Sequence, residues 1–450
     1  MHGRGRVVAA LVAVVTTGCF NPGGAGEATA ATTGAGPTST TAAATSGDPS
    51  SEPPGPTDSS SPGGTTASSQ PSDPTTGSAT ASTEPDTGVG PDASTSAGPS
   101  SDPDTTDPTN TTTDPPVNGP VSFTVDAALF SGAFGVAAVN FDGDELEELF
   151  VTSIMVTSVG VVYDGDVANL KTFGGGAART LVPIQGAMQT YGGMLIPPLA
   201  DPSTLQPYYD DDGTPMLGPN VLIPNACKQP LAIAAANLTA DTASDVAFVC
   251  ADTGGVFVAA GSNNGGFDAP GMAVVGVMGK DVAIAEVNGD DKKDLLVLTD
   301  AQLDIYLGQG GLTFGAAAQS IGLTMPTALV TGDVNLDGST DVVVTKVSGV
   351  CDVFIGGNGD FPGPLEQVCG AVPQDLVIAD LNADLYPEIV IADAAGASVL
   401  YNKGDSTFTM PMSIASVVSA ARVASGDFSG DGKPDVAVTG SGKLTLLVQN

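Results

Sequence analysis

The sequence predicts an all-β protein, a seven-bladed β-propeller that follows a long N-terminal stretch unable to form a core. Two periodic signals lead to this prediction: an acidic nine-residue segment that occurs six times, and a phenylalanine that keeps the same step. Four of the acidic segments, which start at Glu286, Asp333, Asp380 and Asp427, are each 47 residues apart. A period in the forties with strand-like content is typical of propeller blades, because one four-stranded sheet cannot bury both of its faces alone.

One repeat shows the strands that the period implies. β-Branched residues dominate 328–334, 341–347 and 350–356, and turns rich in Gly and Asn separate these runs. The fourth run opens with the phenylalanine that recurs every 47 residues, at Phe267, Phe314, Phe361 and Phe408. Four such runs in succession predict an antiparallel meander, which is the strand order of a blade.

The spacing predicts seven blades in residues 121–450. Acidic segments also start at Asn140 and Asn237, which are 97 residues apart, so one whole blade between them has lost its acidic segment. Counted from Phe173, the lost segment would start at Gly192, where the ligand pattern is absent.

The two ends of this region predict how the ring closes. The chain stops after a third strand at 444–450, whereas 121–125 resembles a fourth strand and precedes the first acidic segment. We expect the N-terminal strand to complete the last blade, since this removes two exposed sheet edges.

Each acidic segment carries oxygen-bearing side chains at positions 1, 3, 5 and 9. Carboxylates and amides at this spacing, together with a backbone carbonyl, can surround Ca²⁺. Without an ion, the carboxylates would repel one another by roughly 4 kcal/mol per pair at an effective dielectric constant near 20. The alternative is an ordinary turn without metal, because Asp, Asn and Gly dominate turns for local hydrogen-bonding reasons. Six copies in register favour structural calcium.

These loops and their spacing resemble the FG-GAP or VCBS-type repeats of integrin α-chain propellers and their bacterial relatives, across essentially all of 121–450. The dipeptide that names the repeat is present at Phe134-Gly135, Phe173-Gly174 and Phe314-Gly315, although its Gly-Ala-Pro extension is mostly absent. The resemblance implies that each acidic loop joins the first and second strands of a blade and binds calcium through positions 1, 3, 5 and 9. It also implies that ligands meet the face opposite to these loops.

The resemblance assigns calcium ligands in six loops. They are Asn140, Asp142, Asp144 and Glu148; Asn237, Thr239, Asp241 and Asp245; Glu286, Asn288, Asp290 and Asp294; Asp333, Asn335, Asp337 and Asp341; Asp380, Asn382, Asp384 and Glu388; and Asp427, Ser429, Asp431 and Asp435. The loop that starts at Asn237 has only two carboxylates and no glycine at position 6, so it is the weakest of these candidates.

The N-terminus has the pattern of an export signal over residues 1–19. Arg4 and Arg6 precede an apolar run at 7–15 that is too short to span a bilayer. The small residues before Cys19 resemble a bacterial lipobox, which implies a lipid on Cys19 and a place at the cell surface or outer membrane. Plain secretion with cleavage nearby is the alternative.

Residues 20–120 consist mainly of Ser, Thr, Pro, Gly, Ala and Asp, without one Lys or Arg. Such a chain cannot recover its ordering entropy by burial, so we expect a disordered linker that holds the propeller away from a surface. A low-complexity stretch without a selected role is the alternative.

Four cysteines remain beyond Cys19: Cys227, Cys250, Cys351 and Cys369. An even number in an exported chain suggests disulfides. Three pairings are possible, and closeness in sequence favours Cys227 with Cys250 and Cys351 with Cys369. Four buried free thiols are the alternative.

The net charge of −37 argues against binding to nucleic acid or to an anionic membrane, because phosphate contacts need clustered Lys and Arg. The single histidine, His2, lies in the signal, so no catalytic set that uses histidine can form. The strongest ligand candidate is Tyr208, Tyr209, Asp210, Asp211 and Asp212, which the period places in a turn between the second and third strands of the blade without an acidic loop. An ordinary acidic turn is the alternative.

The sequence therefore predicts a calcium-stabilised, exported and lipid-anchored propeller that acts as a binding or adhesion module. We expect a monomer that recognises a protein or glycan ligand and meets the membrane only through its lipid. An extracellular carbohydrate-active enzyme that uses carboxylates on a propeller face is one alternative. A purely structural surface subunit is another.

Overall fold

The computed structural model describes residues 121–450, except for 142–143, 145, 175–176, 185–192, 197–203, 211–214, 225–226, 228–229, 240, 251–253 and 263–265. The chain divides into two units, Gly24–Thr112 and the rest, and all described residues belong to the latter. The predictions made for the signal, for Cys19 and for the linker at 20–120 lie outside the described residues.

Seven sheets make up the described region, and each is a blade. Blade 1 contains β2 (Ala133–Val139), β3 (Glu148–Ser153), β4 (Ser158–Val162) and β5 (Leu170–Gly174), and blade 2 contains β6 (Val182–Ile184), β7 (Gly193–Ile196), β8 (Thr204–Asp210), β9 (Pro215–Leu217) and β10 (Val221–Leu222). Blade 3 contains β11 (Pro230–Ala236), β12 (Asp245–Cys250), β13 (Gly255–Ala259) and β14 (Gly271–Val275), and blade 4 contains β15 (Gly279–Ala285), β16 (Asp294–Thr299), β17 (Gln302–Gly310) and β18 (Thr313–Gly322). Blade 5 contains β19 (Pro326–Gly332), β20 (Asp341–Lys346), β21 (Val350–Phe354) and β22 (Leu365–Val368), and blade 6 contains β23 (Asp375–Ala379), β24 (Glu388–Asp393), β25 (Gly396–Leu400) and β26 (Met412–Ala415). Blade 7 contains β27 (Ala420–Gly426), β28 (Asp435–Gly440), β29 (Lys443–Gln449) and β1 (Phe123–Leu129).

In the described part of the chain, the helical structure amounts to one three-residue 3₁₀ turn, η1 (Val167–Asn169). None of the described helical structure is long and apolar enough to cross a membrane.

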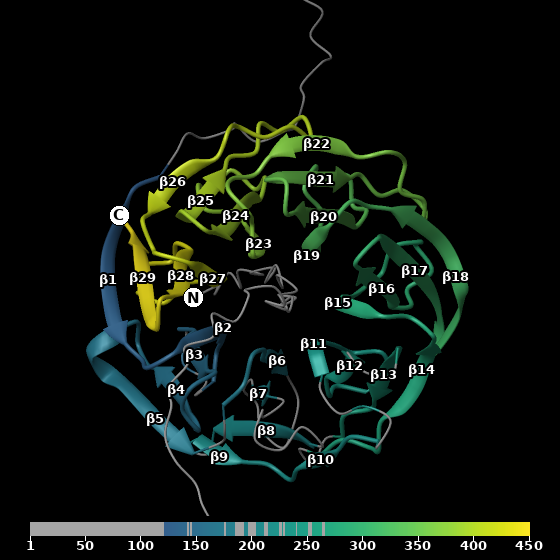
Figure 1. Ribbon diagram of the computed structural model, residues 1–450, viewed down its shortest axis with the longest axis horizontal. Helices are drawn as coiled ribbons and strands as arrows, with labels where there is room; N and C mark the ends of the chain where they lie inside the picture. The colour runs from purple at the N-terminus through teal and green to yellow at the C-terminus, as the bar shows by residue number, and fades with distance from the viewer. Residues whose placement is uncertain are drawn as a thin grey trace, which may run out of the picture. The chain divides into compact units, whose positions relative to one another are not determined.

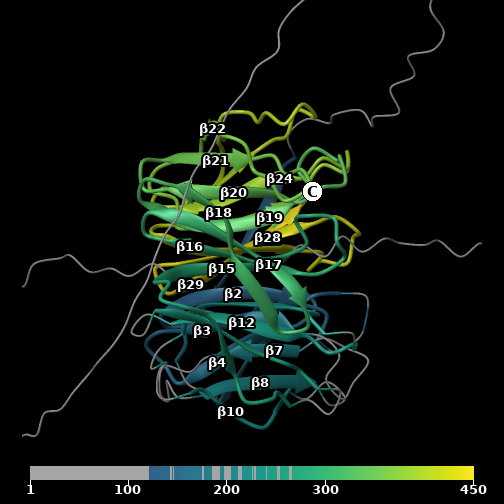
Figure 2. The ribbon, with the colours of Figure 1, turned by 90° about the vertical axis from the view of Figure 1, so that its right-hand side faces the viewer.

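The first strands of the seven blades form a closed inner circle. Each contacts the next, in the order β2, β6, β11, β15, β19, β23, β27 and back to β2, and Figure 1 shows them nearest the centre. Neighbouring strands within a blade are antiparallel, and they run across the thickness of the ring (Figure 2). The prediction of seven blades is therefore confirmed.

This geometry defines two faces. First strands all end on one face, which we call the acidic face; it carries the connections between strands one and two and between strands three and four. The opposite face carries the connections between strands two and three and those between successive blades.

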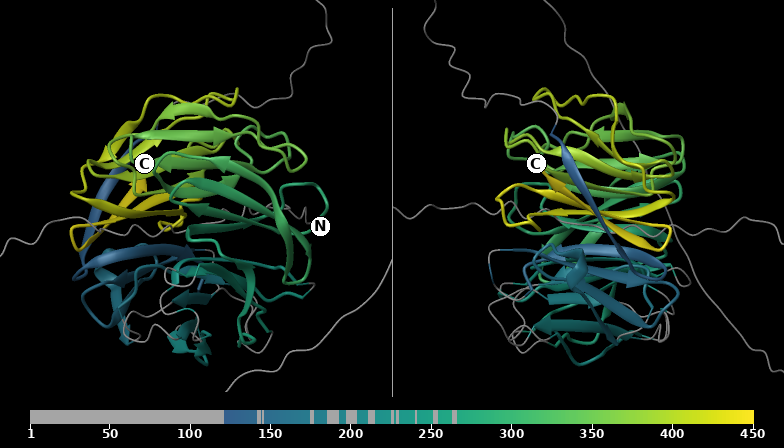
Figure 3. Two further views of the ribbon diagram at one scale, coloured as in Figure 1. Left: turned by 45° about the vertical axis from the view of Figure 1, so that its right-hand side comes forward. Right: turned by 90° about the vertical axis from the view of Figure 1, so that its left-hand side faces the viewer.

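The N-terminal strand closes the ring, as the sequence predicts. β1 pairs with β29 in antiparallel register from Phe123 opposite Gln449 to Leu129 opposite Lys443. Figure 3 shows the two strands side by side. Blade 7 thus combines the two ends of the described region, and β1 covers the edge that β29 would otherwise leave open.

The core lies between blades. Seven clusters of buried apolar residues occupy the seven junctions between neighbouring sheets in the described region. In β20, Val342 and Val344 pack toward blade 4 while Val343 packs toward blade 6, because side chains alternate along a strand. A strand buried on both faces must therefore read as a continuous apolar run, which explains the sequence that follows each acidic loop.

Blade 2 departs from the expected register. Its first strand ends at Ile184 and its second begins at Gly193, so the expected loop start at Gly192 is wrong. The second strands of the other blades begin at position 9 of the loop, which places the start of this loop at Gln185, seven residues earlier. The count from Phe173 overshoots because the connection into the first strand is shorter here than in the other repeats.

Two disulfides link residues that are near in sequence. Cys227 pairs with Cys250 at a Cα–Cα distance of 5.5 Å, and Cys351 pairs with Cys369 at 5.7 Å. These are the pairings that closeness in sequence favours. The first ties the entry into blade 3 to the end of its second strand, and the second ties the third strand of blade 5 to the residue after its fourth.

Candidate functional site

The six acidic loops join the first and second strands of blades 1, 3, 4, 5, 6 and 7. In every one, the second strand begins at the carboxylate of position 9. These six carboxylates have no exposed surface: Glu148, Asp245, Asp294, Asp341, Glu388 and Asp435. Burial of a carboxylate is costly unless hydrogen bonds satisfy its oxygens, so its partners determine what position 9 does.

Position 9 fastens the loop to two strands. One carboxylate oxygen accepts a hydrogen bond from the N–H of position 2, as Asp341 Oδ2 does from Val334 (2.8 Å). The other oxygen accepts from the end of the third strand, as Asp341 Oδ1 does from Gly356 (2.7 Å). The first bond recurs in all six loops, from Phe141, Leu238, Val287, Val334, Leu381 and Phe428, and the second recurs from Gly261, Gly308, Gly356 and Gln449. The carboxylate thus holds three segments of one blade together.

Three glycines at the donor position are required by close approach of the backbone. A Cβ on Gly308 would lie 2.1 Å from the carbonyl oxygen of Lys293, and one on Gly356 would lie 2.0 Å from that of Thr340. Gly261 faces Ser244 in the same way. Our sequence analysis missed these glycines, although their near-47-residue spacing was a usable signal.

The side-chain oxygens of positions 1, 3 and 5 accept hydrogen bonds from backbone N–H groups of their own loop. In the loop of blade 5, Asp333 accepts hydrogen bonds from the N–H groups of Asp337 (3.1 Å) and Gly338 (2.8 Å). Asp337 Oδ1 accepts one from Ser339 (2.7 Å). In blade 6, Asp380 repeats the pattern with the N–H groups of Asp384 (3.1 Å) and Leu385 (2.9 Å).

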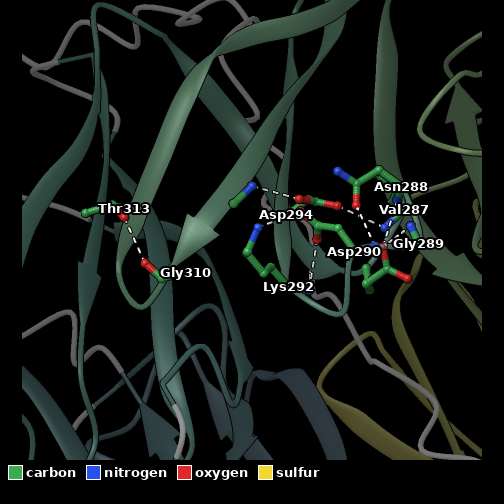
Figure 4. A network of polar contacts seen from close by, with 10 residues as sticks. Val287, Asn288, Gly289, Asp290, Lys292, Asp294, Gly310 and Thr313 are labelled. Carbon is green, nitrogen blue, oxygen red and sulfur yellow. Dashed lines mark hydrogen bonds and ion pairs between the residues drawn. The ribbon is translucent and has the colours of Figure 1, made fainter.

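Two loops also hold a lysine against position 5. In blade 4, Lys292 Nζ lies 2.9 Å from Asp290 Oδ2, and Figure 4 shows this pair beside Asn288 and Asp294. In blade 7, Lys433 Nζ lies 3.2 Å from an oxygen of Asp431. These lysines place a positive charge where a cation would bind, so the loops of blades 4 and 7 differ electrostatically from that of blade 5.

The loops of blades 1 and 3 open with asparagine instead of an acid. Asn140 Nδ2 donates to the carbonyl oxygen of Asp144, and Asn237 Nδ2 donates to that of Asp241. The predicted ligand Asp142 lies outside the described residues. In blade 3, Thr239 donates its backbone N–H to Asp245 Oδ2 (2.7 Å).

Burial raises the pKa of four position-9 acids, Asp294, Asp341, Glu388 and Asp435. Burial, followed by the negative charges of Asp333 and Asp337, raises the pKa of Asp341 to about 6. Burial, with the charges of Asp384 and Asp380 adding to it, raises the pKa of Glu388 to about 8. In the loops of blades 5 and 6, several negative charges therefore act on one another.

The donor set of these loops fits calcium in kind. Each loop offers carboxylate oxygens together with side-chain amide or hydroxyl oxygens at the spacing of a calcium loop. In the described residues, no group of three or more acidic, histidine or cysteine side chains is arranged so that it could hold a metal ion. The loop oxygens accept backbone hydrogen bonds instead.

The opposite face exposes apolar side chains along most of its circumference. They come from connections between strands two and three, from connections between blades, and from strand ends at this face: Ile154, Met155, Val275, Met278, Met325, Val368, Val372 and Val418, which are between 36% and 77% exposed. Met325 and Val372 adopt positive φ angles of 47° and 57°. A β-branched or bulky residue rarely adopts this conformation, so the backbone carries strain where it presents these side chains to solvent.

The predicted position of the tyrosine and aspartate cluster is wrong. Tyr208, Tyr209 and Asp210 end the third strand, β8, whereas the prediction placed them in a turn between strands two and three. The third strand runs parallel to the first, so this end lies at the acidic face. Tyr208 and Tyr209 are buried, at 1% and 8% exposure. Asp211 and Asp212 lie outside the described residues, and the misplacement follows from the irregular connection lengths of blade 2.

The ring of seven sheets, six with four strands and one with five, defines the class of protein, a seven-bladed β-propeller. A family model described as the FG-GAP-like repeat matches residues 286–344 and 380–438. The chain therefore carries FG-GAP-like repeats in two places, each of which starts at an acidic loop and runs into the second strand of the next blade.

Comparison with solved structures agrees on the fold. The crystal structure of BBS1N in complex with ARL6DN, soaked with mercury, is 13% identical with a TM-score of 0.54, and the match covers 73% of this chain and 96% of that chain. A streptogramin B lyase structure is 12% identical with a TM-score of 0.49, covering 73% and 98%. At such identities the likeness shows the fold alone. No curated protein matches this sequence.

Proposed function

We propose that this propeller is an exported binding module that calcium stabilises and that recognises a protein partner through its opposite face. The observation that carries the proposal is the circle of exposed apolar side chains on that face. Large exposed apolar groups gathered on one face are typical of interaction sites. Methionine suits such a surface because its side chain is flexible and polarisable.

The apolar positions follow the repeat. Met278, Met325 and Val372 are each 47 residues apart and stand eight residues before an acidic loop. At the next such position, Ser419 also has a positive φ, of 53°, and its neighbour Val418 is 71% exposed. A side chain kept outward at one position of successive blades supports a contact surface that extends around the ring.

The test uses two matched triple variants. One carries Met155→Ser, Met278→Ser and Met325→Ser on the opposite face, and the other carries Leu336→Ser, Leu385→Ser and Met410→Ser, which remove comparable exposed groups from the acidic face. Extracellular proteins are captured on immobilised wild type and on both variants in calcium, and the proteins retained by wild type are quantified. We expect the first variant to lose capture at least tenfold and the second to retain it. Equal capture by both would refute the proposal.

Calcium is proposed for the loops of blades 1, 3, 4, 5, 6 and 7. The support is the donor set at positions 1, 3, 5 and 9, together with the negative charges of neighbouring loop residues, which add to burial in raising the pKa of Asp341 and Glu388. Bound calcium would neutralise this charge, and the residues of each loop would hold it through their side-chain oxygens. Isothermal titration of the calcium-free protein tests the proposal, since heat that fits no binding isotherm up to 10 mM calcium would contradict it.

Export and lipid anchoring are proposed from the N-terminal segment. Cys19 would carry the lipid, and 20–120 would act as a spacer between membrane and propeller. Metabolic labelling with a radioactive fatty acid should mark the wild type and not Cys19→Ser. Equal labelling of both would contradict the anchor without affecting the proposal for the opposite face.

A further inference from the structure

One position on the inner strands joins blade 4 to blade 5 and blade 6 to blade 7. It lies five residues before the acidic loop, and in blades 4 and 6 it is an aspartate. Asp281 Oδ2 accepts a hydrogen bond from the N–H of Leu329 in blade 5 (3.0 Å), and Asp375 Oδ2 accepts one from Val423 in blade 7 (3.0 Å). At these two junctions a carboxylate therefore caps an N–H group of the next inner strand.

Blade 7 has an arginine at this position. Arg422 pairs with Thr439 of β28, just as Asp281 pairs with Leu298 and Asp375 pairs with Ala392. The three residues therefore hold the same place in their blades. The guanidinium carbon of Arg422 lies 5.0 Å from the centre of the Phe134 ring in blade 1. A guanidinium only donates hydrogen bonds, so Arg422 cannot accept one from the next inner strand as the aspartates do. The N–H that corresponds to those of Leu329 and Val423 belongs to Val136.

The Arg422 side chain keeps one edge unpaired inside the protein. Its exposure is 1%, and Nη1 donates to the carbonyl oxygen of Ala421 (2.8 Å). Nε and Nη2 are buried and have no hydrogen-bond partner. These two nitrogens form the side-on edge that binds two oxygens of a carboxylate or phosphate at once. Leaving such donors unmet in the interior is costly, and the Phe134 ring and the nearby Asp375 compensate the charge but not the N–H groups.

We propose that Arg422, at the junction of blades 7 and 1, binds a small oxyanion of the carboxylate or phosphate class. The oxyanion supplies the acceptor oxygen that the carboxylates of Asp281 and Asp375 supply at their own junctions. Two of its oxygens accept from Nε and Nη2, and one accepts from the N–H of Val136.

The neighbouring acids permit an anion here. Burial raises the pKa of Asp281 to about 7, with the nearby charge of Asp375 raising it further and that of Arg422 lowering it. Burial likewise raises the pKa of Asp375 to about 7, while Arg422 lowers it. Both acids are therefore partly protonated near neutral pH, and their repulsion of an oxyanion is weaker than that of two full charges.

The test compares three purified proteins at fixed calcium concentration and fixed ionic strength: wild type, Arg422→Lys and Arg422→Asp. Lysine keeps the positive charge but lacks the two-pronged edge, whereas aspartate reproduces the junctions of blades 4 and 6. Melting midpoints and calorimetric titrations are recorded with formate, with methyl phosphate and with chloride. Formate and methyl phosphate distinguish a carboxylate ligand from a phosphate ligand.

We expect formate or methyl phosphate to raise the wild-type midpoint above the chloride value. Arg422→Lys should bind the same anion at least about tenfold more weakly, because the bidentate contact is lost. Arg422→Asp should show no oxyanion-dependent shift. Equal shifts in wild type and Arg422→Lys, or a wild type that responds no more than it does to chloride, would overturn the proposal. Should Arg422→Asp fail to fold, titration of Arg422→Lys decides alone.

Discussion

The acidic face and the opposite face use the same 47-residue repeat in different ways. On the acidic face, the side chain at position 9 of each loop is buried and holds three segments together, as Asp341 does. On the opposite face, the residue eight positions before the loops of blades 4, 5 and 6, such as Met325, extends into solvent and contributes little to the blade. The difference shows that a period in a sequence can record a structural requirement at one position and an exposed surface at another.

Removal of calcium has the largest expected effect on the acidic face. A site filled at about a hundredfold its dissociation constant adds roughly 2.7 kcal/mol to the folded state, and several loops act together. The melting midpoint in 10 mM calcium should exceed that in chelator by about 5 °C or more. Circular dichroism measures both, with magnesium at the same concentration as the control. An unchanged midpoint would show that calcium does not stabilise the acidic face.

Loss of one position-9 carboxylate should come next. Asp341→Ala leaves the N–H groups of Val334 and Gly356 without their acceptor, so we expect a loss of about 3 kcal/mol in the free energy of unfolding. The loss should persist in chelator, because these hydrogen bonds need no metal. Asp300→Ala, at a side chain 91% exposed, is the control. Urea unfolding that gives equal losses for the two variants would contradict the role of position 9.

Acid should stabilise the calcium-free protein. The pKa values of Asp341 and Glu388 are raised to about 6 and about 8 from 3.8 and 4.5. Between about pH 4 and 8 the folded state therefore holds protons that the unfolded state has lost, and stability falls as pH rises. In chelator, unfolding at pH 5.5 should need about 3–4 kcal/mol more than at pH 8. Glu388→Gln should flatten this dependence, and the opposite trend in wild type would count against raised pKa values.

The smallest effect on stability belongs to the opposite face. The variant with Met155→Ser, Met278→Ser and Met325→Ser should change the free energy of unfolding by less than about 0.5 kcal/mol per site, because these side chains make few contacts that folding requires. Calcium-loaded melting measures this. A loss as large as that of Asp341→Ala would mean that these residues are structural, and the contrast between the faces would fail.

The fold could be predicted because a repeat shows its period directly. The spacing of the acidic loops and phenylalanines predicted the blade number, and the unmatched strand at 121–125 predicted the closure at Phe123–Leu129. Blade 2 was harder, because connection lengths are not fixed by burial. There the 47-residue period placed Tyr208 before the third strand, although it lies near the end of that strand. It also placed the lost acidic loop seven residues too late.

The site could be predicted only in part. The residue types at position 9 are the same for a calcium ligand and for an acceptor of two backbone N–H groups, so the sequence cannot separate these roles. The glycines at 261, 308 and 356 have a spacing that could have revealed the second role. The role proposed for Arg422 could not be predicted from the sequence, because it depends on a comparison with the aspartates that hold the same register in other blades.

The pairing of β1 with β29 has a consequence for the order in which the protein folds. Leu129 and its partner Lys443 are 314 residues apart, so the described strand that is synthesised first can pair only after the described strand that is synthesised last. Contacts between such distant segments form slowly. Until they form, β1 and the third strand of an unfinished blade are open edges available to other chains. A chain interrupted before Lys443 would keep them open, so this final pairing distinguishes finished molecules from fragments.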